Sequence, residues 1–381
     1  MRVAVISESF LPTVSGVTQS VCQVLDHLAR TGHEAMVIAP AGAPSRYAGF
    51  PVHTVPAVAL RQFPVGLPSP QVQRLLAEFR PDVLHAASPF LLGAQGIIAA
   101  KRLGIPSVAV FQTDVAGFAG RNRLGQARRA AWRFVKWVHD GADLTLAPSS
   151  ASLADLTRIG VTRLGYWARG VDLTGYHPNR KNDPDVVALR ARLAPHGEVL
   201  VGYVGRIAPE KQVERLQALR GIPGIRLVIV GDGPAELSVR RRLAGLPVSY
   251  LGRLGGHELA AAYAALDVFV HAGTAETFGQ TLQEAHAAGL PVVAPRAGGP
   301  IDLVQHGHTG LLFTPDDDLD LHGCVLRLVT DAALRRRMGE AGRRAVLSRS
   351  WESVCDELLH HYESVIVRVP SPEISGPRTV H

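Results

Sequence analysis

The sequence predicts an α/β protein of two domains, each built on a parallel β-sheet flanked by helices. The chain has 381 residues, more than one compact domain usually holds, and 46% of them are hydrophobic, enough for two cores. Strand-like apolar runs alternate with helix-like stretches in both halves, which is the pattern of parallel sheets with crossover helices. Such sheets bind ligands at the carboxyl ends of their strands, so we expect the functional residues there.

The predicted boundaries follow changes in the character of the chain. We expect a first domain over residues 1–171, a polar linker with a first helix over 172–195, and a second domain over 196–347. A final helix is expected over 348–368. The tail, residues 369–381, lacks the apolar residues needed for a core and is expected to be disordered.

The segment ETFGQTLQE, from Glu276 to Glu284, gives the strongest indication of function. It lies between two strand-like apolar runs and is predicted to form a loop followed by a helix. Gly279 lets the backbone approach a ligand, and a helix that begins near Gln280 presents free N–H groups and the positive end of its dipole to an anion. With Glu276 on the loop and Glu284 inside the helix, the segment suits a phosphate that carries hydroxyl-rich groups, as in a sugar nucleotide.

A second segment, VLVGYVGRIAPEKQ, indicates the same kind of ligand. Its apolar part is a buried-strand pattern, and Pro209 suits the first position of a helix, where its missing N–H costs nothing. Arg206 at the strand end and Lys211 in the first turn could converge on a diphosphate. The chain has only four lysines, which favours a specific role for Lys211 over that of an ordinary solvent-exposed residue. A solvated helix start is the alternative interpretation.

Six motifs in a fixed order resemble those of the family 4 retaining glycosyltransferases. They are MRVAVISESFLPTVSGVTQSV, RGVDLTGYHP, VGYVGRIAPEKQ, LVIVGDGP, the segment from Glu276 to Glu284, and GGPIDLVQHGHTGLLF. The resemblance extends from residue 1 to about residue 365. It implies the GT-B fold, in which two Rossmann-like parallel-sheet domains face a central cleft. The first domain would bind the acceptor, the second would bind the nucleotide sugar, and the final helix would cross back to the first domain.

Two further segments, ESFLPTVSGV and FQTDVAGFA, are most similar to bacterial enzymes that transfer mannose from GDP-mannose to lipid-linked acceptors. This narrower resemblance implies a GDP-mannose-dependent α-mannosyltransferase of glycolipid biosynthesis. Three alternatives stay open. The protein could use a UDP-sugar donor and a small-molecule acceptor, it could carry out epimerase or phosphorylase chemistry on the same fold, or it could be a non-catalytic subunit that binds a nucleotide sugar.

The resemblance implies a role for each motif residue. Arg206 and Lys211 would bind the donor diphosphate, Glu276 the hydroxyls of the transferred sugar, and Glu284 the ribose. Gly16, in the first loop of the first domain, would close over the diphosphate. The other donor-binding residues expected from the motifs are Leu251 near the nucleobase, Phe278, Gly279 and Gln280.

Gln112 marks a departure from the family pattern. Many relatives carry a histidine at this place, whereas this chain has FQTD, and a glutamine cannot shuttle a proton. Asp114, two residues further on, is expected to take over contact with the acceptor. The mechanism proposed for the family lets the departing phosphate accept the acceptor's proton. It therefore depends on positioning and electrostatic stabilisation more than on a side-chain base.

No metal ion or other cofactor is expected. The run Asp316–Asp318 is similar to a metal-binding DxD, but it precedes a predicted helix, where carboxylates act as caps. The histidines lack the spacing of a metal pair on one helical face. The first strand is not followed by GxGxxG, and the chain has no Walker A sequence, which argues against a dinucleotide-dependent dehydrogenase and a P-loop NTPase.

The net charge of +7 is consistent with an anionic membrane surface, an anionic donor or nucleic acid as partner. Its focus is residues 121–140, a predicted basic amphipathic helix with two tryptophans. Such helices are typical of proteins that bind anionic lipid, and a scaffold helix is the alternative. Nucleic acid is not expected, because no nucleic-acid-binding motif accompanies the charge.

Several features predict a cytoplasmic protein. No apolar run approaches the length of a membrane span, and Met1 leads straight into a strand, so no signal peptide is expected. The three cysteines are widely spaced and are expected to be reduced thiols. Peripheral attachment to the inner face of the membrane, through the basic helix, is a further expectation.

Overall fold

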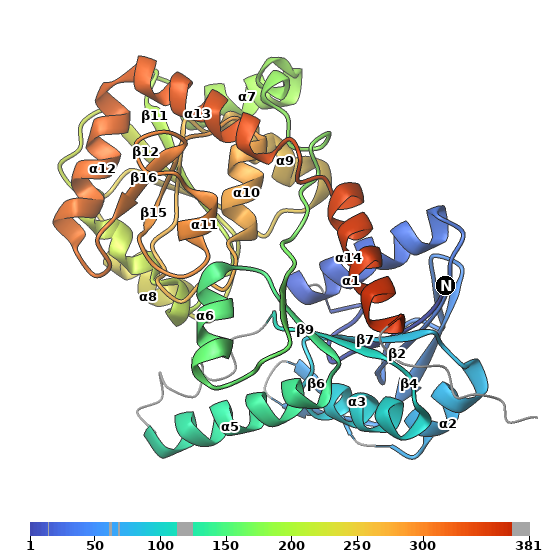
Figure 1. Cartoon of the computed structure of the whole chain (residues 1–381). Helices are drawn as coiled ribbons and strands as arrows, with labels where there is room; N and C mark the ends of the chain where they lie inside the picture. The colour runs from blue at the N-terminus through green and yellow to red at the C-terminus, as the bar shows by residue number, and fades with distance from the viewer. Residues whose placement is uncertain (14, 61–62, 68, 113–124, 368–381) are drawn as a thin grey trace, which may run out of the picture. The chain divides into compact units, whose positions relative to one another are not determined.

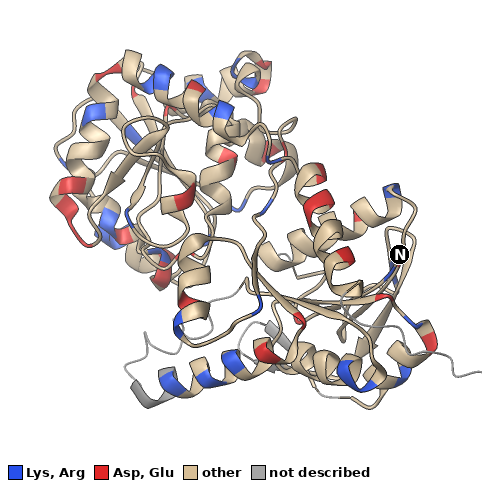
Figure 2. Ribbon diagram, in the orientation of Figure 1, with Lys and Arg blue, Asp and Glu red and all other residues tan. Residues whose placement is uncertain are grey.

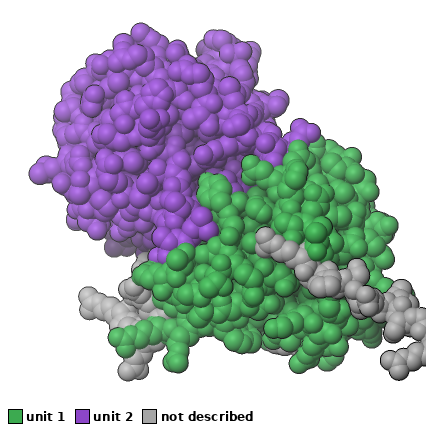
Figure 3. Space-filling view, in the orientation of Figure 1, with its two compact units in different colours: residues 1–147, 156–167, 355–381 green, residues 148–155, 168–354 purple. Residues whose placement is uncertain are grey.

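The structure, a computed structural model, describes residues 1–13, 15–60, 63–67, 69–112 and 125–367. The chain divides into two compact units (Figure 3). Each unit has its own sheet. Unit 1 comprises residues 1–147, 156–167 and 355–381, and unit 2 comprises residues 148–155 and 168–354.

Unit 1 is built on an eight-stranded sheet of order β10-β9-β8-β7-β1-β2-β4-β3. The strands are β1 (Arg2–Ser7), β2 (Glu34–Pro40), β3 (Arg46–Tyr47), β4 (Phe50–Val55), β7 (Val83–Ala87), β8 (Ser107–Val110), β9 (Leu144–Ala147) and β10 (Leu164–Tyr166). The central strands are buried along nearly their whole length and are mostly apolar, because helices cover both faces of the sheet. The predicted parallel-sheet domain is confirmed, and its one antiparallel pairing is the short pair of β3 and β4 at one edge of the described sheet.

Helices lie on both faces of the unit 1 sheet (Figure 1). They are α1 (Gly16–Arg30), α2 (Gln71–Phe79), α3 (Leu91–Leu103) and α5 (Gly125–Gly141), with α6 (Ser150–Arg158) shared between the units. One core joins α2, α3 and α5 to the sheet, with Ile6, Leu84 and Ile97 among its buried residues. A separate antiparallel pair, β5 (Ala57–Leu60) and β6 (Phe63–Gly66), lies between β4 and α2 in the sequence.

The last helix, α14 (Trp351–Ile366), packs on unit 1 from Cys355 onwards. The hydroxyl of Tyr362 lies 2.7 Å from Nδ1 of the buried His85. The Asp356 carboxylate lies 3.0 Å from Nε2 of His27 on α1. Helix α14 follows unit 2 in the sequence, yet its buried Tyr362 packs in unit 1, where the chain begins.

Unit 2 has a six-stranded, wholly parallel sheet of order β13-β12-β11-β14-β15-β16. The strands are β11 (Val199–Val204), β12 (Ile225–Val230), β13 (Val248–Gly252), β14 (Val268–Val270), β15 (Val292–Pro295) and β16 (Gly310–Phe313). Separate hydrophobic cores cover its two faces. The α-helices are α7 (Pro184–Leu193), α8 (Glu236–Arg242), α9 (Gly256–Ala265), α10 (Gln280–Ala287), α11 (Pro300–Leu303), α12 (Asp318–Thr330) and α13 (Ala332–Val346). The 3₁₀ segments are η1 (Pro178–Asn182), η2 (Pro209–Lys211) and η3 (Val213–Leu219).

The three cysteines, Cys22, Cys324 and Cys355, are free thiols, and the last two are buried. Among the helices that the structure describes, none combines the length and the apolar character required to cross a bilayer.

Candidate functional site

The strand order of unit 2 creates a place where a ligand can bind. From β11 the chain builds outward through β12 and β13, and it then returns to add β14 on the opposite side of β11. The loops after β11 and β14 therefore leave the same edge of the sheet in opposite directions. In open parallel sheets this switch point is where ligands bind. Both loops carry residues that the sequence predicts for the site.

The loop after β11 carries the two predicted diphosphate ligands. The backbone N–H of Ile207 donates to the Asp232 carbonyl at 2.7 Å, which fixes the loop on the end of β12. Pro209 begins η2, as predicted for a helix start, although the helix is a short 3₁₀ turn. The Arg206 guanidinium pairs with the Glu210 carboxylate one turn away.

The loop after β14 carries Glu276 and leads into α10. Gly279 has a φ of +104°, in the left-handed region that glycine adopts without strain, and α10 begins at the next residue. The backbone N–H of Gly299 donates to the Glu276 carbonyl at 2.8 Å. The predicted order of strand, loop, helix and strand around Glu276 is confirmed.

Lys211 and Glu276 meet although 65 residues separate them in the sequence: the ammonium Nζ lies 2.6 Å from Oε2 of the carboxylate. Burial alone would raise the pKa of Glu276, but the positive charge of Lys211, the neighbouring His271 and a hydrogen bond from the Phe278 backbone lower it to about 2. Glu276 is therefore ionised at neutral pH. The site presents a fixed cation and a fixed acceptor of hydrogen bonds side by side.

His271 is a member of this cluster that the sequence analysis did not single out. It directly follows β14, is 2% exposed, and its Nε2 lies 3.9 Å from the same oxygen of Glu276 that contacts Lys211. Burial lowers the pKa of His271 to about 4, so the imidazole is neutral at physiological pH. A histidine at the carboxyl end of a central strand was the only available signal.

Glu284 lies inside α10 in a more apolar setting. The Tyr263 hydroxyl donates a hydrogen bond of 2.8 Å to its Oε2, and Gln280 is a second side-chain partner. Burial raises the pKa of Glu284 to about 7, and these hydrogen bonds and the charge of Arg169 only partly oppose it. The two glutamates of the segment thus have pKa values on opposite sides of the ordinary value.

Arg169 is a second residue that the sequence analysis missed as part of the site. Burial lowers its pKa to about 10, while the charges of Glu276 and Glu284 act to raise it. Its carbonyl accepts a 2.8 Å hydrogen bond from the Gln283 side chain, and the Gly170 carbonyl accepts one of 3.0 Å from Gln280. The RG dipeptide was visible only as part of a linker motif, although it is tied to α10.

The remaining predicted residues are distributed over both units. In unit 2, Leu251 is half-buried on β13, and Phe278 is buried in a core, so that its backbone faces Glu276. In unit 1, Gly16 is the first residue of α1 behind the capping Ser15, and Gln112 is half-buried just after β8. Asp114 lies outside the described residues.

The run Asp316–Asp318 has the capping function that the sequence predicts. Asp317 caps α12 and accepts hydrogen bonds from the backbone N–H groups of Leu319 and Asp320. Asp316 and Asp318 each contact the Arg215 guanidinium at 2.9 Å. Within the part of the chain that the structure describes, no group of three or more His, Cys, Asp or Glu side chains is arranged to hold a metal ion.

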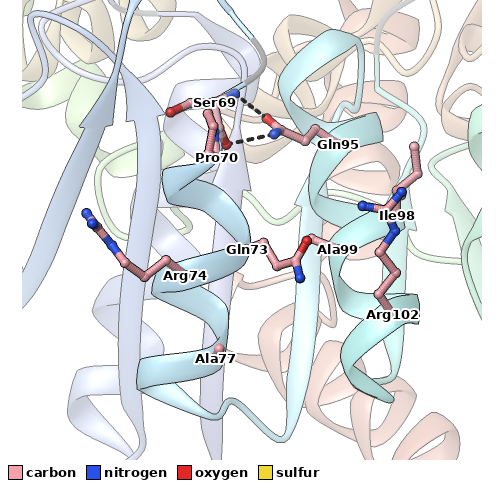
Figure 4. A pocket seen from close by; sticks show the side chains of 9 residues that line it. All are labelled: Ser69, Pro70, Gln73, Arg74, Ala77, Gln95, Ile98, Ala99 and Arg102. Atoms are coloured by element: carbon pink, nitrogen blue, oxygen red, sulfur yellow. Dashed lines mark hydrogen bonds between the residues drawn. The ribbon is translucent and has the colours of Figure 1, made fainter.

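A groove lies between α2 and α3 of unit 1, with a volume of about 620 Å³, and none of the predicted site residues lines it (Figure 4). One end is closed by Ser69 and Gln95, whose backbone and side-chain amides exchange hydrogen bonds of 2.8 and 2.7 Å. The other lining residues are Pro70, Gln73, Arg74, Ala77, Ile98, Ala99 and Arg102.

Comparison with known families matches most of the chain in two parts. Residues 14–174 match the family described as Glycosyltransferase Family 4. Residues 188–345 match the family described as Glycosyl transferases group 1. The first match covers most of the residues of unit 1, and the second covers the sheet of unit 2 and the site around Glu276.

Curated relatives are similar to the chain over nearly its whole length. A GDP-mannose-dependent alpha-mannosyltransferase of Mycolicibacterium smegmatis is 49% identical and covers 97% of this chain and 98% of that protein. A protein of the same name from Corynebacterium glutamicum is 44% identical, with 97% and 91% covered. Among solved structures, Anabaena HepE in complex with UDP has a TM-score of 0.80 at 20% identity and covers 96% of this chain and 100% of that one. The last likeness is one of fold.

Proposed function

The chain belongs to the family 4 glycosyltransferases and has their GT-B fold, and on this premise we propose that it transfers mannose from GDP-mannose to a lipid-linked acceptor. The observation that carries the proposal is the ion pair of Lys211 and Glu276 at the switch point of the unit 2 sheet. A cation for the diphosphate and a carboxylate for sugar hydroxyls are both present there, in the order along the chain that the family requires.

The donor is proposed to bind to unit 2 in an extended manner. Arg206 and Lys211 neutralise the charge that develops on the departing diphosphate, and Glu276 accepts hydrogen bonds from the mannose hydroxyls. Glu284 holds the ribose, with Gly279 and Gln280 between the two carboxylates. Leu251 lies on the strand proposed to face the base.

Unit 1 is proposed to bind the acceptor, with Gln112 and Asp114 near the acceptor. Gly16 is proposed to contact the donor diphosphate. In a reaction that retains anomeric configuration, the departing phosphate oxygen can take the proton of the attacking hydroxyl on the same face of the sugar. Neither Gln112 nor Glu276 is then required as a base. What the side chains contribute is orientation of both substrates and stabilisation of the leaving group.

The names of the relatives support mannose as the sugar and guanine as the base of the donor. Proteins 49%, 48% and 44% identical to this chain are named GDP-mannose-dependent alpha-mannosyltransferases. A more distant relative, 27% identical, is named for the transfer of mannose to a phosphatidylinositol dimannoside. The second name supports a lipid acceptor.

A membrane-proximal acceptor is also supported by the surface of unit 1. Helix α5 buries Val135 and Val138, leaves Arg129 and Arg133 exposed, and exposes 55% of Trp137. Basic residues recur along this helix (Figure 2). The buried side is that of a scaffold helix, and the other side has the basic and aromatic residues of an interfacial one, so the two interpretations are compatible. Helix α3 packs against α5, and the groove between α2 and α3 adds further exposed arginines to unit 1.

Calorimetric titration with GDP, UDP and ADP, followed by GDP-mannose, tests the proposal. We expect GDP to bind most tightly, and Arg206→Ala and Lys211→Ala to weaken binding at least ten-fold. Arg241→Ala, which alters an exposed arginine on α8 of the same unit, is the matched control and should bind as wild type. Preference for UDP or ADP would contradict the mannose donor, and binding of none of them would favour a non-catalytic subunit.

A further inference from the structure

The cluster around Glu276 contains a side chain for which the proposed function provides no role. His271 is almost fully buried at the end of β14, where its backbone N–H donates to the Val293 carbonyl at 2.8 Å. The Gly273 backbone is a hydrogen-bond partner that acts to raise the pKa of the imidazole, but within the described residues neither ring nitrogen makes a hydrogen bond of ordinary length and angle. A buried polar group without such a bond is costly, so its presence needs an explanation.

His271 lies next to a carboxylate oxygen of Glu276 that already forms an ion pair with Lys211. Oε2 of Glu276 contacts Lys211 at 2.6 Å and faces Nε2 of His271 at 3.9 Å. Both groups approach the same carboxylate oxygen, but only Lys211 is close enough for a hydrogen bond. A shift of about 1 Å would bring the imidazole into hydrogen-bond range of that oxygen.

Donor binding, as proposed above, disturbs this arrangement. The Lys211 ammonium contacts Glu276 at 2.6 Å, and the same ammonium is proposed to bind the diphosphate. As Lys211 turns to the diphosphate, the buried Glu276 carboxylate loses part of its compensating charge. A buried carboxylate that loses its partner is strongly disfavoured unless another donor replaces it.

We propose that His271 is the reserve partner of Glu276: when the diphosphate draws Lys211 away, the neutral imidazole donates its Nε2–H to Oε2 of the carboxylate. His271 is thus a positioning residue, which keeps Glu276 ionised and oriented toward the sugar. No proton is transferred, because the imidazole donates a hydrogen bond and stays bonded to its hydrogen. This inference rests on the proposed function of Lys211 as a diphosphate ligand.

The test is the affinity for GDP, measured by calorimetry in two variants of similar size. His271→Gln keeps an N–H donor near the position of Nε2, and His271→Met removes it. We expect His271→Met to weaken GDP binding about ten-fold, the effect of one hydrogen bond to a charged group, and His271→Gln to retain most of the affinity. GDP is the suitable probe because it lacks the mannose, whose hydroxyls are proposed to contact Glu276 and could replace the lost hydrogen bond.

A double-mutant cycle separates this role from a packing role. In a Glu276→Gln background the neutral amide needs no charge compensation, so we expect His271→Met to have no further effect on GDP affinity. His286→Met is the matched control. His286 is also buried in unit 2, on α10 against Gly342, and among the described residues it has the Thr309 backbone as a partner but makes no hydrogen bond of ordinary length and angle. It should bind GDP as wild type.

Three results would overturn the inference: wild-type GDP affinity in His271→Met, an equal loss in His271→Gln, or the same loss in the Glu276→Gln background. Should His271→Met fail to fold, ¹⁵N NMR of the wild-type imidazoles, assigned with His271→Gln, gives a second measurement. Unchanged His271 resonances on saturation with GDP would then refute the inference. Failure of the proposed function is distinct, because in that case Arg206→Ala and Lys211→Ala would leave GDP affinity intact.

Discussion

The ammonium of Lys211 lies 2.6 Å from the carboxylate of Glu276 and joins the loop after β11 to the loop after β14. Each of these groups is proposed to contact a different part of the donor, yet in the structure they neutralise each other. Arg206 is held in the same way by Glu210. The diphosphate must therefore compete with two carboxylates, and the strength of these ion pairs helps to set the affinity for the donor.

Removal of Lys211 should destabilise the protein as well as weaken donor binding. Lys211→Met leaves a buried carboxylate without its cation, and we expect the free energy of unfolding to fall by about 3 kcal/mol. Lys211→Met with Glu276→Gln should recover most of this loss. Chemical denaturation of the wild type and of these two variants measures the loss and its recovery. Arg74→Met, which breaks an exposed pair with Glu78, is the control and should cost under about 1 kcal/mol.

The pH dependence of stability provides an independent check on the same ion pair. The pKa of Glu276 is lowered to about 2 from an ordinary value of 4.5. Its stabilising contribution is therefore present above pH 4.5 and is lost as the pH falls toward 2. If the double variant and the wild type lost stability in parallel over this range, the low pKa of Glu276 would be contradicted.

Glu284 should make donor affinity depend on pH near neutrality. Burial raises its pKa to about 7, and the ionised carboxylate is the better acceptor for ribose hydroxyls. We therefore expect affinity for GDP to rise several-fold as the pH increases through 7 and this dependence to be absent in Glu284→Gln. Calorimetry at a series of pH values measures both, and a dependence that persists in Glu284→Gln would assign it to another group.

The same raised pKa has the opposite sign for stability. Between the ordinary pKa of 4.5 and the value of about 7, the folded state holds a proton on Glu284 that the unfolded chain has released. The contribution of this group to stability therefore decreases as the pH rises through that interval. Glu284→Gln should remove this decrease, which thermal unfolding at a series of pH values can detect.

Local features of the site were predictable from the sequence because they depend on neighbouring residues. A glycine followed by polar residues predicted a helix from Gln280, and this helix is found; the left-handed conformation of Gly279 is a finding of the structure. The caps provided by the Asp316–Asp318 run were predictable for the same reason.

The contacts of the site could not be predicted in the same way. Lys211 contacts Glu276 only because β14 pairs with β11, and no local pattern in the sequence predicts that these two strands are neighbours. His271 and Arg169 were overlooked for a related reason. Each is an isolated polar residue in an apolar or linker segment, and its importance follows from burial beside charges that are distant in the sequence.

The loop that carries Glu276 should be sensitive to a side chain at Gly298. Gly298 has a φ of +62°, and a Cβ there would lie 2.3 Å from the Glu276 carbonyl oxygen. We expect Gly298→Ala to displace Glu276 and to reduce transfer at least ten-fold. Gly307→Ala is the control, since Gly307 has a φ of +82° but nothing within 4 Å of such a Cβ. It should cost only about 1 kcal/mol of stability. Equal activities of the two variants would contradict a positional role for Glu276.

The exposed side of α5 should determine binding to anionic membranes. Arg129→Glu with Arg133→Glu reverses two exposed charges, and Trp137→Ser removes an aromatic ring that is 55% exposed. Each basic residue near an anionic surface contributes about 1 kcal/mol, so the double reversal should reduce binding to phosphatidylglycerol vesicles more than ten-fold in a sedimentation assay. Binding to phosphatidylcholine vesicles should be weak in all variants. Arg241→Glu on α8 and Leu237→Ser, at a residue that is 70% exposed, are the matched controls in unit 2. If these controls lost as much binding as the α5 variants, the attraction would come from overall charge, and α5 would be a scaffold helix only.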